Sequence, residues 1–163
     1  MPFDRTHSYV VECHKNGTVT ALAMRDIGGG CFSGVSIDPR RDLANESDDG
    51  RFDVGYPGSG AAQLAVAILA DAFEVPLDGE TLSPADTARV LAAYHGFSQA
   101  VLAKIGGGAT GGPFRWEMTR SAIIHLVEKA ERRGWLAVAE EYDRNRAYSP
   151  RHVGEQAFRR TKK

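Results

Sequence analysis

A glycine-rich turn over residues 55–60, with the sequence Gly-Tyr-Pro-Gly-Ser-Gly, leads directly into an apolar segment and is the part of the chain best placed to bind a small anion. Glycine lets backbone amides approach another group closely, and the first N–H groups of a helix have no partner within that helix. An oxyanion at the start of the helix would use both properties. The same turn is equally suited to a structural role, as a tight entry to a buried helix. The candidate contacts are Ser59, Gly60, Ala61, Gln63 and His95.

The familiar catalytic turns do not fit this segment. A nucleoside triphosphatase turn needs a lysine and a hydroxyl residue after its last glycine, where the chain has two alanines. The dinucleotide-binding fingerprint needs glycine or alanine where Gln63 stands, and a hydrolase elbow around Ser59 needs glycine in place of Pro57. The sequence therefore predicts no catalytic residue and no cofactor. The alternative is an enzyme, or a protein that binds a small molecule or anion, at the Gly58-Ser59-Gly60 turn. It would use Ser59, Gly60 and Gln63, with His95 or one of the acids Asp48, Asp49 and Asp53 nearby.

The segment from residue 38 to residue 53 is strongly polar and predicts a surface loop. Four acidic residues in its second half offer oxygen ligands, but their spacing matches no calcium loop, so no metal site is predicted. Cys13 and Cys31 lack the paired spacing of a metal site and predict reduced, structural thiols.

The charge of the chain is unevenly distributed. Residues 142–163 contain seven Lys or Arg against two acids, a net charge of +5, which leaves −6 on the rest of a chain whose formal net charge is −1. Such a segment suits contact with a polyanion, or charge pairing with the domain or a partner chain. Its aromatic residues can stack on bases or dock onto the domain, and docking is the favoured interpretation. The basic residues are Arg144, Arg146, Arg151, Arg159, Arg160, Lys162 and Lys163.

Alternating apolar residues predict three strands near the start of the chain, over residues 8–14, 18–24 and 31–37. Asn16-Gly17 is the pair preferred by a two-residue type I′ hairpin turn, so the three strands predict an antiparallel meander. A further segment, residues 114–118, is either a short edge strand or an extended lead-in to a helix.

Four helices follow from spacing and capping signals. They are expected over residues 61–73, from Ser83 to about 105, from a cap at Thr119 to Gly134, and over 135–146. Gly96 interrupts the second of these helices, and an interior glycine there predicts the close approach of a neighbouring helix.

These elements predict an α+β fold in which three or four helices pack against a small antiparallel sheet. With 42% hydrophobic residues in 163, the chain predicts one compact domain over residues 1–147 and a basic extension over 148–163. The longest apolar run is too short to cross a bilayer and no leader is recognisable, so we expect a cytoplasmic protein without membrane contact.

Three segments, residues 55–71, 94–105 and 116–119, resemble an uncharacterised domain family of prokaryotes and their phages and plasmids. The first carries the pattern G-Y-x-G-S-G-x-A-Q-L-A before an apolar helix, and the resemblance spans residues 45–124. The chain departs from the family at Ala61, where members often have proline. The resemblance implies a mobile-element setting and carries no activity or catalytic residues.

The function expected from these features is non-enzymatic binding to a host macromolecule. The partner would be a host protein, as for an inhibitor of a bacterial defence system, or a nucleic acid, as for an accessory protein of a phage or plasmid. A homo-oligomer is also compatible with apolar surface around the two tryptophans.

Overall fold

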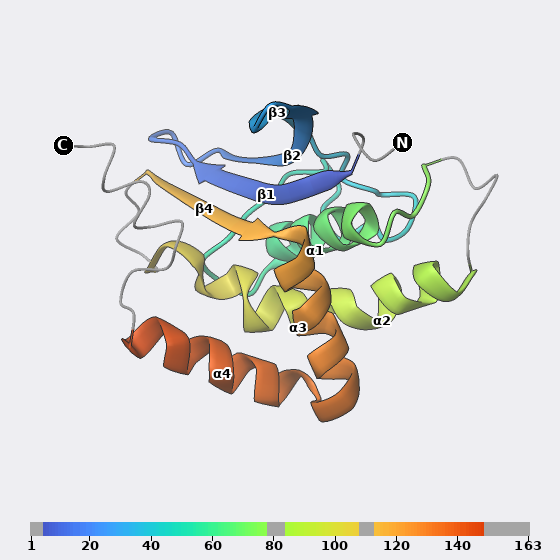
Figure 1. The fold of residues 1–163 in the computed structure, drawn as a ribbon. Coiled ribbons are helices and arrows are strands. Elements are labelled where there is room, and N and C mark those ends of the chain that lie inside the picture. Colours follow the sequence, from blue (N-terminus) through green and yellow to red (C-terminus); the bar gives the residue numbers. More distant parts are fainter. Residues whose placement is uncertain (1–4, 78–83, 108–112, 149–163) are drawn as a thin grey trace.

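The computed structural model describes residues 5–77, 84–107 and 113–148, and it has the predicted α+β fold. A four-stranded antiparallel sheet lies on one side of the molecule and the helices lie on the other (Figure 1). The strand order is β3-β2-β1-β4. The strands are β1 (Thr6–Cys13), β2 (Val19–Gly28), β3 (Cys31–Ser36) and β4 (Phe114–Thr119).

The first long helix forms the centre of the core. Residues 60–70 of α1 are all buried, because this helix lies between the sheet and the other helices. A helix that is apolar on all sides is stable only in such a position. The helices are α1 (Ser59–Ala72), α2 (Pro84–Ala100), the 3₁₀ helix η2 (Leu102–Gly107), α3 (Arg120–Arg133) and α4 (Trp135–Tyr148).

The sheet has four strands, one more than the three-stranded meander that the start of the chain predicts. The meander itself is confirmed, since β1 pairs with β2 and β2 with β3, each pair antiparallel. The fourth strand, β4, pairs with the free side of β1 and places Trp116 opposite Val11 on the buried face. The sequence left residues 114–118 open between a strand and a lead-in, and the structure shows an edge strand.

The hairpin between β1 and β2 differs from the two-residue turn expected at Asn16-Gly17. A type I′ turn needs positive φ at both residues, and only Gly17 has it, at 83°. The N–H of His14 donates to the carbonyl of Thr18 at 2.8 Å and closes a three-residue loop. The glycine is therefore used for the single left-handed position of this longer turn.

Several helix signals are confirmed. The hydroxyl of Thr119 accepts a hydrogen bond from the N–H of Ala122 at 3.2 Å and caps α3, which ends at Gly134. A Cβ on Gly96 would lie 2.2 Å from the Trp135 ring, so this glycine lets α4 approach α2. The helix expected to run to residue 105 ends as α2 at Ala100 and continues as the tighter η2. The cap expected at Ser83 lies outside the described residues.

Candidate functional site

A cleft of about 570 Å³ lies at the start of α1, between the β1–β2 hairpin turn and the loop that precedes the helix. Gly58 occupies the N-cap position with extended backbone and, having no side chain, leaves the cap without a side-chain hydrogen bond. Ser59 is exposed on the cleft wall and Gly60 is buried beside it. The Ala61 side chain points into the core. The predicted anion contacts at residues 59–61 are therefore positioned around one feature, the first turn of the helix.

The cleft also contains acidic side chains, and one of them explains the glycine at position 60. A Cβ on Gly60 would lie 2.7 Å from the Cβ of Asp53. The Asp53 carboxylate accepts hydrogen bonds from the backbone N–H of Val54, at 2.9 Å, and from the Tyr56 hydroxyl. Asp49 lines the same cleft. Carboxylates beside a helix start already supply the negative charge that this position favours, so the geometry supports a structural turn over an anion site.

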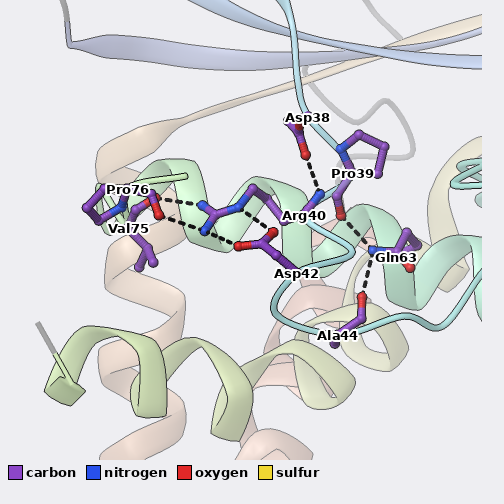
Figure 2. Close-up of polar contacts among 8 residues, drawn as sticks. All are labelled: Asp38, Pro39, Arg40, Asp42, Ala44, Gln63, Val75 and Pro76. Carbon is purple, nitrogen blue, oxygen red and sulfur yellow. Dashed lines mark hydrogen bonds and ion pairs between the residues drawn. The ribbon is translucent and has the colours of Figure 1, made fainter. Parts of the chain in front are cut away.

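Gln63 is fully buried and holds the polar loop against α1 (Figure 2). Its side-chain carbonyl accepts from the N–H groups of Glu46 and Ser47 at 2.9 and 3.1 Å. Its amide donates to the carbonyls of Pro39 and Ala44 at 2.6 and 3.0 Å. A glutamine amide has two donors and two acceptor positions, and all four are used within the chain. We therefore assign Gln63 to the fold and not to a ligand.

Arg40 makes a second clamp between the same loop and the end of α1 (Figure 2). Its guanidinium pairs with both carboxylate oxygens of Asp42 at 3.0 Å. It also donates to the carbonyls of Val75 and Pro76 at 2.6 and 2.9 Å. Arg40 is 4% exposed and has a positive φ of 57°. The expectation of a surface loop is therefore wrong for this residue, because the loop folds inward and the guanidinium binds the backbone carbonyls of Val75 and Pro76, in the segment that follows α1.

His95 lies in a different polar cluster from Ser59. The Tyr94 hydroxyl donates to Glu46 at 2.5 Å, and His95 Nε2 lies 3.6 Å from the same carboxylate. Burial, followed by the hydrogen bond that Tyr94 donates to Glu46, raises the pKa of Tyr94 to about 12, so this hydroxyl remains a donor at neutral pH. His95 is not among the residues that line the Ser59 cleft. The geometry therefore gives no support to a Ser59–His95 pair.

The helix α4 carries the start of the basic segment. Tyr142 is 8% exposed and packs in the core, which confirms docking for this aromatic residue, while Arg144 is exposed. The predicted contact Arg146 lies on the same helix, but its side chain is outside the described part of the structure. Also outside the described residues are Arg151, Arg159, Arg160, Lys162 and Lys163.

The two cysteines are both free. Burial raises the pKa of the Cys13 thiol, with a smaller contribution from Asp53, and this favours its protonated form. Within residues 5–77, 84–107 and 113–148, no three His, Cys, Asp or Glu side chains gather where they could hold a metal ion. No helix in this part of the chain is both long and apolar enough to cross a membrane.

The roles of Arg40, Glu46 and Tyr94 were not recognised from the sequence. Both Arg40 and Glu46 occur in a run of charged residues that reads as solvated surface. One signal was available: Gln63 interrupts an otherwise apolar helix, and a polar side chain buried there requires hydrogen-bond partners from another segment. That requirement predicts that a loop packs on α1, although it does not identify the loop.

The fold and the clamps define a small α+β domain whose central helix is covered by a polar loop on one side. A family model described as a family of unknown function (DUF6166) matches residues 24–129, and the chain belongs to this family. The matched region runs from the middle of β2 into α3, so it includes both clamps and leaves out α4 and the basic segment. Searches of curated proteins and of solved structures found no match.

Proposed function

We propose that this protein is a non-enzymatic binding protein of a phage or plasmid and that nucleic acid is its target in the host. The observation that carries the proposal is the net charge of +5 on residues 142–163, against −6 on the rest of the chain. A basic segment on an acidic domain attracts a polyanion to that segment of the chain. The mobile-element setting rests on the sequence resemblance described above.

The structure of α4 supports this proposal. The buried side chains of Val138 and Tyr142 dock the helix on the domain, which gives the basic segment a rigid base. The two acids nearest Arg144 are both engaged by lysines of other elements. Asp143 pairs with Lys104 at 2.9 Å and Glu141 pairs with Lys129. Neutralised acids repel a phosphate backbone less, so the positive charge of the segment is more effective.

The test is binding of labelled single-stranded DNA, duplex DNA and RNA to the full chain at low and physiological salt. Each phosphate neutralised contributes a slope of about −0.7 to −0.9 to log K against log salt. We expect a slope steeper than about −2, with little dependence on base sequence. In a tail variant, Arg151, Arg159, Arg160, Lys162 and Lys163 are all replaced by Gln, and we expect this variant to lose most of the affinity.

A matched control removes the same number of exposed positive charges from the domain. It replaces Lys15, Arg41, Arg51, Arg132 and Arg133 by Gln. The control lowers the net charge as much as the tail variant, and we expect it to retain most of the binding. Equal losses in the two variants would show a general charge effect and contradict a tail site. Absence of binding to all three nucleic acids at low salt would overturn the proposed target.

A host protein is the second candidate target, and one observation favours it. The edge strand β3 is exposed along its whole length, and Phe32 and Val35 present apolar side chains at 43% and 42% exposure. An open edge of this kind can add a strand from a partner, or from a second copy of the chain. Association through such an edge depends less on salt than phosphate binding does.

An infection assay tests the protein target. If the chain inhibits a bacterial defence system, its expression restores phage growth on a host that carries the system. The double variant Phe32→Glu, Val35→Lys then loses the effect, while Leu136→Glu, an exposed position on α4, retains it. Light scattering at several concentrations separates self-association from a foreign partner. Restored growth that survives the edge substitutions would exclude β3 as the contact.

A further inference from the structure

A second cavity, of about 430 Å³, lies at the opposite end of α1 from the glycine turn. Its walls come from β1, β2 and β3, from the loop after β3, from the end of α1 and the segment that follows it, and from the start of α3. The volume is within the range of pockets that hold small molecules. Charged side chains line much of it, which is unusual for a space beside the core. They are Arg5, Arg25, Arg40 and Arg120, with Asp38, Asp71 and Glu74.

Arg25 projects from the buried face of the sheet. It follows Ala21 and Ala23 at two-residue spacing on β2, and both alanines belong to the core. In the ladder it lies between Thr6 of β1 and Ser33 of β3. Its Nε is buried and has no hydrogen-bond partner among the described residues. A buried cationic donor without a partner is costly, so its presence in the cavity wall calls for an acceptor.

Arg120 contributes a second guanidinium from the first position of α3. Its Nε donates to the carbonyl of Ala72 at 2.8 Å, which fixes the plane of the group at the cavity wall. Two guanidinium groups from separate elements that line one cavity form a common recognition arrangement for phosphate and carboxylate groups.

Partners within the chain already engage the remaining charges of the cavity. The Asp71 carboxylate accepts the Tyr9 hydroxyl at 2.6 Å, and Glu74 pairs with Arg5 at 3.1 Å. Burial, and then Asp71, raise the pKa of Tyr9, so its hydroxyl remains a donor. Arg40 uses four of its five guanidinium N–H groups on Asp42 and two carbonyls, and Asp38 accepts the backbone N–H of Arg40. Arg25 therefore differs from the other charged residues of the cavity, because this partly buried arginine has a buried Nε without an acceptor within the described residues.

We propose that this cavity binds a small molecule carrying a phosphate or carboxylate group, with Arg25 and Arg120 as the donors to the oxyanion. Tyr9 and Arg5 each engage one oxygen of the Asp71 and Glu74 carboxylates, and the second oxygen of each would accept from hydroxyl or amino groups of the ligand. A polar metabolite with one oxyanion and several hydrogen-bond donors matches this lining. The site is distinct from the basic segment and does not depend on nucleic-acid binding.

Isothermal titration calorimetry of the full chain tests the site with defined probes. The probes are inorganic phosphate, ribose 5-phosphate, adenosine monophosphate, succinate and citrate. We expect at least one probe to bind. Binding of the phosphate probes identifies a phosphate site, and binding of succinate or citrate identifies a carboxylate site. Arg25→Gln removes the charge and keeps a polar side chain, and we expect it to weaken binding at least tenfold. The control Arg132→Gln, at the exposed end of α3, leaves the affinity unchanged.

Two results would overturn the proposal: no probe binds the wild-type chain at millimolar concentration, or Arg25→Gln binds as tightly as wild type. Circular dichroism verifies that each variant is folded. If Arg25→Gln does not fold, Arg120→Gln replaces it under the same criterion, because both guanidinium groups are assigned to the oxyanion. A tenfold loss then supports the site, and unchanged affinity refutes it.

Discussion

Arg40 and Arg25 line the same cavity, and the contrast between them separates the parts of this molecule that hold the fold from those that point to a ligand. Arg40 uses its guanidinium on Asp42 and on the carbonyls of Val75 and Pro76. Arg25 has a buried Nε without an acceptor in the described part of the chain. When the N–H groups of a buried arginine are hydrogen-bonded within the chain, as in Arg40, the fold alone accounts for that residue. When a buried N–H group has no acceptor among the described residues, as for Arg25 Nε, a bound molecule can supply the acceptor.

The same distinction applies to the predicted site residues. Gln63 is saturated by four backbone groups of the polar loop, and Asp53 fills the space beside Gly60. Gln63 and Asp53 are therefore both part of the contacts that hold the loop on α1. The glycine turn has the sequence most typical of a ligand site. At this end of α1, however, contacts within the chain account for the glycine and for the polar residues, whereas at the other end the Nε of Arg25 lacks such a contact within the described residues.

Substitution of the most saturated residue should have the largest effect on stability. Gln63→Leu keeps the approximate volume but leaves two N–H groups and two carbonyls of the loop without partners. Each unsatisfied buried group costs about 1–3 kcal/mol, and partial hydration of the loop reduces the sum to about 4 kcal/mol. Urea unfolding measures the loss. A change below about 1 kcal/mol would show that the loop does not depend on this clamp.

Arg40→Met should destabilise the protein by about 3 kcal/mol. The carbonyls of Val75 and Pro76 lose their donors, whereas Asp42 is partly exposed and regains water. The same urea measurement gives the value, with Arg41→Met as a control at the exposed neighbouring position. If Arg40→Met and Arg41→Met were equally stable, the hydrogen bonds of Arg40 would contribute no more to stability than those of an exposed arginine.

The Arg40–Asp42 pair also predicts a pH dependence. The hydrogen bond from Arg40 lowers the pKa of Asp42 in the folded state. The stability from the pair is therefore complete above the ordinary aspartate pKa and is lost as the pH falls through the lowered value. Because Asp42 is partly exposed, the effect is at most about 1 kcal/mol. The difference in unfolding free energy between wild type and Asp42→Asn should shrink in acid. A difference that grows in acid would contradict this sign.

Arg25→Met should have the smallest effect on the stability of the ligand-free protein. Arg25 is partly buried, with a buried Nε that has no acceptor among the described residues, so an apolar side chain there changes stability by about 1 kcal/mol or less, and a gain is expected. Thermal and urea unfolding beside Arg40→Met give the direct comparison. A loss as large as that of Arg40→Met would mean that Arg25 is also a structural clamp.

The local features of the fold were predictable from the sequence because they depend on neighbouring residues. The meander, the Thr119 cap and the packing glycine Gly96 follow from alternation, capping and helix propensity. The pairing of β4 with β1 was left open, because the two strands are far apart in sequence and no local pattern reports such a contact. The hairpin type was misjudged because Gly17 fits a two-residue and a three-residue loop equally well.

The candidate residues were predicted less well than the fold. Charged loop residues read as surface, and only the tertiary structure shows that Arg40 is buried by the end of α1. Arg25 did leave a signal. It has the same strand parity as Val19, Ala21 and Ala23, but it lies one residue beyond the strand predicted over residues 18–24, so alternation places it on the buried face only in the longer β2 of the structure. The cavity that receives it requires the placement of α1 and α3, which no local rule provides.

The most direct test of this account is the NMR spectrum of the arginine Nε–H groups of the full chain. It is recorded during separate titrations with a single-stranded oligonucleotide and with the tightest small probe. We expect the oligonucleotide to shift signals of Arg151, Arg159 and Arg160, the small probe to shift the signal of Arg25, and the signal of Arg40 to respond to neither. A shift of Arg40 equal to that of Arg25, or no response of Arg25 to any probe, would contradict the division between fold-holding and ligand-binding arginines.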